Sequence, residues 1–141
     1  MRTLLAMLVT VFAGLAAAQD ISLENGSIRQ PMPGRTITAG YFTLHNATAE
    51  EQRLVAVSSP MFAKIELHQH SHQNGMMKME QVEFIAIPAQ QSVVLQPGGL
   101  HLMLFEPDAA LAPGQMLPLE LKFANGSTLS AEVPVVAMPK R

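Results

Sequence analysis

The feature that most constrains this chain is a succession of short runs in which apolar and polar residues alternate, separated by Gly, Pro and Asn. Beyond residue 20, no stretch of ten or more residues shows helical periodicity. Alternation with a period of two is typical of strands that bury one face and expose the other. We therefore expect an all-β chain with strands at 21–28, 37–46, 53–58, 64–70, 79–87, 91–96, 100–105, 116–123 and 127–135.

Turn-forming residues separate these runs and indicate how the strands connect. Asn74-Gly75 and Asn125-Gly126 are the dipeptides that two-residue hairpin turns prefer. Eight or nine short strands joined by such turns predict a β-sandwich. We expect one helical turn, between Pro107 and Leu111.

The amino end has the pattern of a secretory signal peptide. Met1-Arg2-Thr3 is followed by an apolar run to Leu15 and by small residues up to Ala18. We expect cleavage after Ala18, which leaves residues 19–141 as a single domain. The apolar run is shorter than the roughly 20 residues that a bilayer crossing needs, so we expect no membrane insertion after cleavage.

Composition limits the partners of the processed chain. Hydrophobic residues make up 48% of the sequence and charged residues 14%, which is typical of a globular protein. Without Arg2, eight basic and eleven acidic residues remain, giving a net charge of −3. No basic cluster stands out, so nucleic acid and anionic lipid are not expected partners.

The absence of cysteine restricts the chemistry of any metal site. Exported domains of this size often depend on disulfides, and this chain cannot form one. A soft-metal site would also have to be built without thiolates, which an oxidising compartment converts to disulfides. Ten methionines supply sulfur that is not lost in that way.

Two histidines and two methionines occur at a defined spacing. His68 is followed after ten residues by Met79, after a further twenty-one by His101, and two positions later by Met103. Imidazole accepts several transition metals, but its combination with neutral thioethers favours monovalent copper, Cu(I). In a strand over 100–105, His101 and Met103 share one face and three leucines share the other, so both candidate ligands reach one ion without distorting the backbone.

The segment between His68 and Met79 contains further candidate ligands. A turn at Asn74-Gly75 would fold it back, so that Met79 or Met77 returns toward the strand carrying His68 and the loop caps the site. We consider four residues as auxiliary metal ligands: His70, His72, Met76 and Met77. Whether Cu(II) binds at His70 and His72 is left open.

The methionines and histidines also permit other interpretations. Methionine most often fills cores, which suffices for Met61, Met116 and Met138, while Met32 could lie beside the site or cover the edge of the core. Three histidines suit zinc, and a hydrolase would need a carboxylate base, for which Glu66 is the nearby candidate. A third reading is an adhesive β-sandwich with a methionine-rich binding loop. No catalytic motif is present, so we do not expect an enzyme.

With these residues in view, the chain resembles the periplasmic copper A chaperone (PCuAC) family. That family's pattern of His or Met, ten residues, Met, twenty-one residues, His, one residue and Met falls on His68, Met79, His101 and Met103 without a gap. Flanking segments agree over residues 20–136, including Tyr41 to Asn46, Gly75 to Met79, Pro97 to Leu104 and Val133 to Val135. The histidine- and methionine-rich C-terminal tail of some members is missing here.

The resemblance implies a fold, a location and partners. It implies a cupredoxin-like or immunoglobulin-like β-sandwich in the bacterial periplasm, which carries Cu(I) to the dinuclear copper centre of cytochrome c oxidase subunit II or to related oxidases. A Sco-like thiol protein would act alongside it. The alternative within the copper class is sequestration or resistance without delivery to an oxidase.

Overall fold

The computed structural model describes residues 20–138, so the expected signal peptide and its cleavage point lie outside the described residues. Ten strands make up the regular structure: β1 (Ile21–Arg29), β2 (Ile37–Asn46), β3 (Gln52–Ser58), β4 (Phe62–Gln73), β5 (Met76–Gln81), β6 (Ile85–Ile87), β7 (Ser92–Val94), β8 (Leu100–Pro107), β9 (Met116–Phe123) and β10 (Thr128–Val136). Among the described residues there is no helix, and accordingly none that could cross a membrane.

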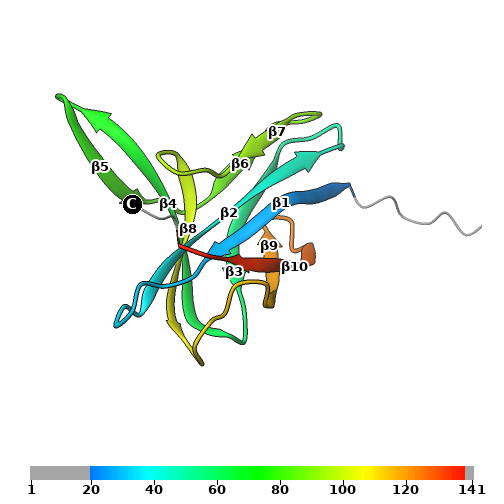
Figure 1. Ribbon diagram of the computed structural model, residues 1–141. Helices are drawn as coiled ribbons and strands as arrows, with labels where there is room; N and C mark the ends of the chain where they lie inside the picture. The colour runs from blue at the N-terminus through cyan, green and yellow to red at the C-terminus, as the bar shows by residue number, and fades with distance from the viewer. Residues whose placement is uncertain (1–19, 139–141) are drawn as a thin grey trace, which may run out of the picture.

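The strands form two halves that share one core (Figure 1). The first half, called sheet A here, has the order β5-β4-β8-β2-β1, with β7 also paired to β2. The second half, sheet B, has the order β10-β9-β3-β6. A short parallel pairing of β1 with β10 joins them, so all ten strands belong to one mixed sheet. The expected all-β, cupredoxin-like sandwich class is confirmed.

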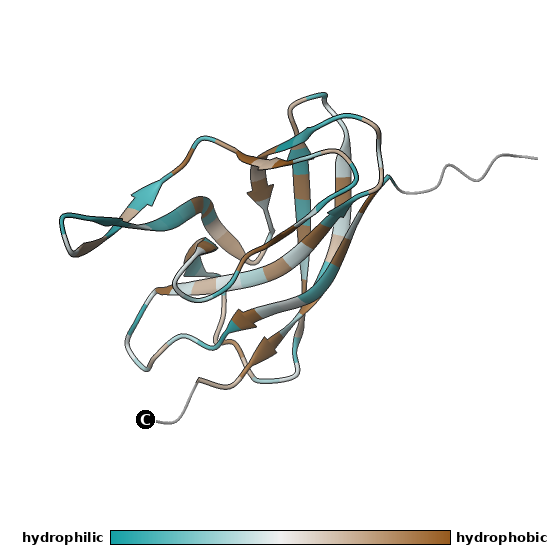
Figure 2. Cartoon of the chain, turned by 90° about the horizontal axis from the view of Figure 1, so that it is seen from above, coloured by the Kyte–Doolittle hydropathy of each residue, from teal (hydrophilic) through white to brown (hydrophobic). Residues whose placement is uncertain are grey.

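The core lies between the two halves and is built by the alternation seen in the sequence. In β9, Leu117, Leu119, Leu121 and Phe123 are buried while the residues between them are exposed. Sheet A contributes leucines from β2, β4 and β8 to the same cluster. Hydrophobic and hydrophilic residues accordingly alternate along the strands in Figure 2. Each fully buried leucine contributes about 2 kcal/mol of hydrophobic stabilisation.

Two expected elements differ from the structure. The run 79–87 is not one strand: β5 pairs with β4 in sheet A, and β6 pairs with β3 in sheet B. The alternation breaks at the adjacent apolar residues Phe84 and Ile85, and Ile85 is the first residue of β6 in the other sheet. The prediction of a helical turn between Pro107 and Leu111 is also wrong. Pro107 ends β8, and the Asp108 N–H donates instead to the Met61 carbonyl at 2.8 Å.

The strand around His68 is longer than expected. It spans Phe62–Gln73 because its second half pairs with β5 through the whole hairpin. Both central residues of the turn, Asn74 and Gly75, have positive φ angles of 54° and 74°. Such angles define the tight hairpin turn that this dipeptide predicts. The β4–β5 hairpin projects from the rest of the fold at the upper left of Figure 1.

Candidate metal centre

The candidate site begins on β8, where alternation divides the strand into two faces. Leu102 and Leu104 are fully buried in the core. His101 and Met103 lie on the opposite face, as the sequence predicts. His101 is nevertheless only 4% exposed. The rings of His70 and His68 lie over it, with centroids 5.0 Å and 5.8 Å from its own.

The pairing of β4 with β8 places the histidines side by side. His68 lies directly opposite His101, and Glu66 lies directly opposite Met103. Residues opposite each other in an antiparallel pair project from the same face of the sheet. His68, His101 and Met103 therefore share the outer face of sheet A, with Met103 diagonal to His68.

The hairpin turn brings β5 back along β4, as expected. Its register sets Met79 opposite His70 and Met77 opposite His72, while Gln81 lies opposite His68. Met79 is thus diagonal to His68, and its side chain is 47% exposed. The four spaced residues share one face of the three strands β5, β4 and β8.

The backbones of the four spaced residues are not equally close to one another. β5 and β8 flank β4 on opposite sides, so Met79 and Met103 are separated by roughly 10 Å across the strands, besides their offset along them. Thioether side chains are long and flexible, and Met79 is exposed. The structure brings His68, His101 and Met103 together on β4 and β8, and it places Met79 on the other side of β4, diagonal to His68.

Hydrogen bonds orient the two paired imidazoles. The His101 Nδ1–H donates to the Gly99 carbonyl at 3.1 Å, which leaves the Nε2 lone pair free. The His68 Nε2–H donates to Glu66 Oε1 at 3.3 Å, which leaves Nδ1 with the lone pair. That Nδ1 is buried and has no hydrogen-bond partner among residues 20–138. Metal-binding histidines characteristically donate the N–H of their second ring nitrogen to a carboxylate or a backbone carbonyl in this way.

The turn before β8 explains the orientation of His101. Gly98 has a φ angle of +82°, a conformation that favours glycine. The turn directs the Gly99 carbonyl toward β4, where it also accepts the backbone N–H of His70 at 3.2 Å. One carbonyl therefore sets the ring of His101 and anchors β4 beside it.

Burial changes the protonation of this histidine. The pKa of His101 is lowered from 6.5, mainly because burial disfavours the charged ring. The nearby His70 and His68 lower it further, and the bond to Gly99 opposes them. His101 is therefore neutral at pH 7, as a metal ligand must be.

The auxiliary candidates separate into distinct positions. His70 lies inside the cluster, and its buried Nδ1 has no hydrogen-bond partner in the described part of the chain. His72 and Met77 are exposed at the outer end of the hairpin. Met76 pairs with Gln73 and projects from the other face, because one residue along a strand reverses the side-chain direction.

The remaining side chains considered from sequence lie elsewhere. His45 is hydrogen-bonded to Ser92 Oγ and to Glu24 Oε2, the latter at 3.0 Å, which accords with a solvated or bonded role. Met32 is half exposed and lines a hollow of about 510 Å³ together with Pro31, Met138 and Pro107, the last residue of β8. His101 and Met103 of the same strand do not line it.

Glu66 has a role in the structure that differs from the one expected from the sequence. The sequence suggests only a hydrolase base at this position, whereas in the structure its carboxylate accepts the His68 ring hydrogen and lies 3.8 Å from Lys64 Nζ. The i, i+2 spacing of Glu66 and His68 on one strand was the signal for this contact. Within residues 20–138, no three His, Cys, Asp or Glu side chains are arranged to hold a metal ion.

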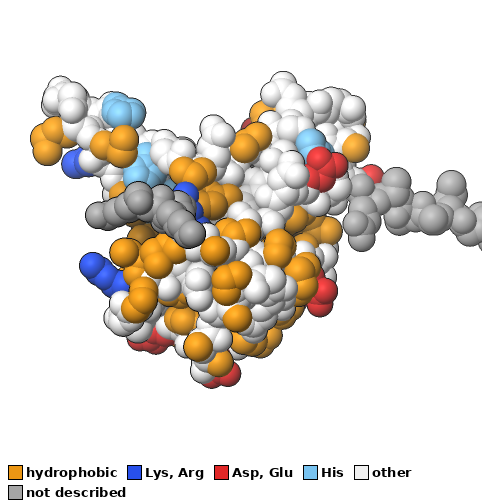
Figure 3. Space-filling view, viewed as in Figure 1, with side chains coloured by type: hydrophobic (Ala, Val, Ile, Leu, Met, Phe, Trp, Pro, Cys, Tyr) orange, Lys and Arg blue, Asp and Glu red, His pale blue; other side chains and the backbone are white. Residues whose placement is uncertain are grey.

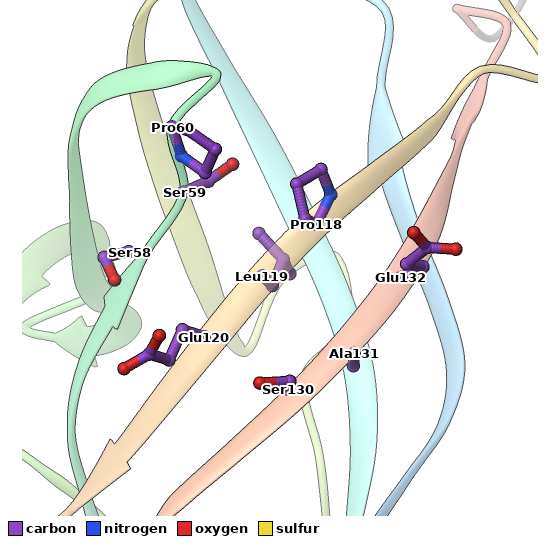
Figure 4. A pocket seen from close by; sticks show the side chains of 9 residues that line it. All are labelled: Ser58, Ser59, Pro60, Pro118, Leu119, Glu120, Ser130, Ala131 and Glu132. Carbon is purple, nitrogen blue, oxygen red and sulfur yellow. The ribbon is translucent and has the colours of Figure 1, made fainter.

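The surface of the molecule has two separate features, the hairpin with its histidines and a groove on sheet B. Hydrophobic and histidine side chains lie together on the projecting hairpin and beside its base in Figure 3. A groove of about 600 Å³ lies on sheet B, with Glu120 and Glu132 among its lining residues (Figure 4). None of the residues that line it belongs to β4, β5 or β8, so the groove is separate from the histidine cluster.

Comparison with known proteins identifies the family. The model of the family described as "Putative lipoprotein LpqE-like" matches residues 21–135. The chain belongs to this LpqE-like family. It is 32% identical over 103 residues to the "Putative lipoprotein Lxx21020" of Leifsonia xyli subsp. xyli, covering 72% of this chain and 62% of that protein. It is 31% identical over 99 residues to the uncharacterized protein RP573 of Rickettsia prowazekii, covering 70% and 55%. This LpqE-like chain thus spans about 55–62% of the length of these relatives.

Solved structures share the fold of this LpqE-like protein. The solution structure of Cu(I)-DR1885 from Deinococcus radiodurans is 29% identical, with a TM-score of 0.67 and coverage of 89% of this chain and 82% of that one. Its apo form is 27% identical, with a TM-score of 0.66 and coverage of 98% and 93%. The copper-bound PCuAC domain from PmoF2, at 23% identity, shows the same fold with a TM-score of 0.72 and coverage of 86% and 97%. The resemblance to PCuAC proteins expected from the sequence is confirmed.

Proposed function

We propose that this protein is an exported Cu(I) metallochaperone that holds the ion with His68, Met79, His101 and Met103. The observation that carries the proposal is the orientation of the two imidazoles. Each ring donates the hydrogen of one nitrogen to a fixed oxygen, which leaves a lone pair on its other nitrogen, and both rings lie on the sheet face that carries both methionines. Two neutral imidazoles with two thioethers match the preference of Cu(I) for soft, uncharged donors.

The relatives support copper as the cargo. DR1885 has been solved with Cu(I) and the PmoF2 domain with copper, and both share this fold. Relatives described as putative lipoproteins support export to the periplasm, consistent with the signal-like amino end. The proposed role is carriage and transfer, without an enzymatic reaction.

The donor set also indicates how the ion would leave. Because all four proposed ligands are neutral, they hold Cu(I) less firmly than a set of thiolates does. An acceptor rich in cysteine can therefore take the ion by ligand exchange, in which each new bond to a thiolate replaces a bond to a neutral donor. We propose as acceptors cytochrome c oxidase subunit II, or a related copper oxidase, and a Sco-like thiol protein.

Anaerobic titration with Cu(I), read by X-ray absorption, tests the proposed site. The wild-type protein should bind one ion with both nitrogen and sulfur neighbours. The variant Met79→Leu/Met103→Leu keeps a similar shape and should lose copper loading. The matched control is Met116→Leu, which changes an equally exposed methionine on sheet B. Undiminished sulfur coordination in the double variant would exclude the proposed ligand set.

A second experiment separates delivery from sequestration. Deletion of the protein in its bacterial host should lower copper-oxidase activity chiefly when copper is limiting, if it delivers the ion. Increased sensitivity to excess copper with normal oxidase activity would instead assign it to sequestration. Binding of partners that survives the loss of both methionines would point to the adhesive alternative.

A further inference from the structure

The β4–β5 hairpin carries a second set of donor side chains beyond the proposed site. His72 and Met77 lie directly opposite each other next to the turn, and both are exposed, Met77 to 59%. The next pair inward is His70 with Met79, followed by His68 with Gln81. Imidazole and thioether donors therefore form successive cross-strand pairs from the exposed tip to the buried cluster.

The opposite face of the same hairpin has a different composition. Alternation places Gln69, Ser71, Gln73, Met76, Lys78 and Glu80 on that face. Between positions 68 and 81 the face that leads to the cluster is uncharged, whereas the other face carries a lysine and a glutamate. All three histidines of the hairpin, together with Met77 and Met79, thus lie on the face that carries His101, and Met76 is the one thioether of the hairpin on the other face.

The spacing of these pairs suits transfer of an ion from one pair to the next. Residues two apart in a strand are separated by about 6.8 Å. Long side chains from two successive pairs can therefore both reach an ion that lies between the pairs. The innermost step is close already, because the ring centroids of His70 and His101 are 5.0 Å apart. The buried Nδ1 of His70 has no hydrogen-bond partner within the described residues.

We propose that His72 and Met77 form a capture site for Cu(I), from which the ion passes through the His70–Met79 pair to His68, His101 and Met103. This inference rests on the proposed function. Each step is a ligand exchange in which one bond from nitrogen or sulfur to the ion forms as another breaks. The ion stays monovalent and the ligands stay neutral, so no oxidant or reductant is needed.

Loading kinetics test the capture site separately from the final site. The variant His72→Ala/Met77→Leu removes the donors at the tip, and Gln73→Ala/Met76→Leu is the matched control on the other face of the same turn. All four side chains are exposed, so both variants should fold normally. Each protein is mixed anaerobically with the Cu(I) complex of a chromophoric chelator, and both the rate of loading and the equilibrium affinity are measured.

The two measurements distinguish the possible outcomes. The capture variant should load about tenfold more slowly than wild type, with an equilibrium affinity unchanged within about twofold, while the control matches wild type in both. A loading rate equal to that of wild type overturns the capture site. A parallel loss of affinity also overturns it, since His72 and Met77 would then belong to the final site. Failure of the wild-type protein to bind Cu(I) would instead refute the proposed function.

Discussion

At the scale of single residues, the contact between Glu66 and His68 determines which ring nitrogen of His68 is available. The carboxylate accepts the Nε2 hydrogen, so the buried Nδ1 keeps its lone pair. In His101 the roles of the two nitrogens are reversed, because the Gly99 carbonyl accepts from Nδ1. The two rings thus keep the lone pair on different nitrogens, each selected by a neighbouring oxygen.

Removal of the Glu66 carboxylate should weaken copper binding without removing a ligand. In Glu66→Leu, we expect about tenfold lower Cu(I) affinity, because loss of an outer acceptor frees the ring to rotate and change tautomer. Glu66→Gln keeps an acceptor oxygen and should retain more affinity. Competition titration measures both, with Glu80→Leu on the other face of the hairpin as the control. Wild-type affinity in Glu66→Leu would contradict this role.

The lowered pKa of His101 predicts how acid affects the metal-free protein. Burial keeps the ring neutral in the folded state below pH 6.5, whereas the unfolded chain takes up the proton near that value. The unfolding free energy should therefore fall as pH drops below about 6.5, until the folded pKa is reached. Denaturant unfolding between pH 8 and 5 should show a smaller acid loss in His101→Gln than in wild type. An acid loss in His101→Gln equal to that of wild type would contradict this account.

At the scale of elements, the irregular part of β1 shows how closely the two halves approach. The β1–β2 register shifts between Glu24 and Ser27, and Gly26 lies in that irregularity. A Cβ atom at Gly26 would lie 2.3 Å from Val133 Cγ1 in β10. The glycine thus permits contact between sheet A and sheet B where β1 passes β10.

Gly26→Ala should accordingly destabilise the fold by about 2 kcal/mol through overpacking. The double variant Gly26→Ala/Val133→Ala should recover part of this loss, because the smaller side chain removes the clash. Denaturant unfolding of both single variants and of the double variant gives the coupling energy. Strictly additive losses would show that the approach of these two side chains is not what requires glycine.

The elements also show how far periodicity could predict the structure. β2 and β9 begin and end as expected, since each has one buried face for its whole length. The single strand predicted over 79–87 is wrong, because β5 and β6 pair with different partners in different sheets, and strand pairing is not a property of the segment itself. The extension of β4 likewise depends on its pairing with β5, and no property of β4 alone indicates it.

At the scale of the whole molecule, the proposed site ties the projecting hairpin to the body of sheet A. His101 and Met103 belong to β8 within the fold, whereas Met79 belongs to the hairpin strand β5. An ion bound by both groups would cross-link the hairpin to the body of sheet A. Binding to the folded state alone must therefore raise the stability of the whole domain.

Copper binding should raise the unfolding free energy by about 2.7 kcal/mol when free Cu(I) is one hundred times its dissociation constant. Anaerobic denaturant unfolding at several Cu(I) concentrations measures this increase. The variant Met79→Leu/Met103→Leu should unfold at the same denaturant concentration with and without the ion. An equal copper-dependent increase in that variant would place the binding site elsewhere.

Local patterns in the sequence are enough to predict the all-β class, most strand positions, the hairpin turn and the shared face of His101 with Met103. These properties follow from local periodicity and turn chemistry, which act over a few residues. Only the tertiary structure decided that His68 lies opposite His101, that Met79 lies opposite His70, and that Glu66 and Gly99 orient the rings. Register between strands depends on the packing of both sheets around one core, and no single segment contains that information.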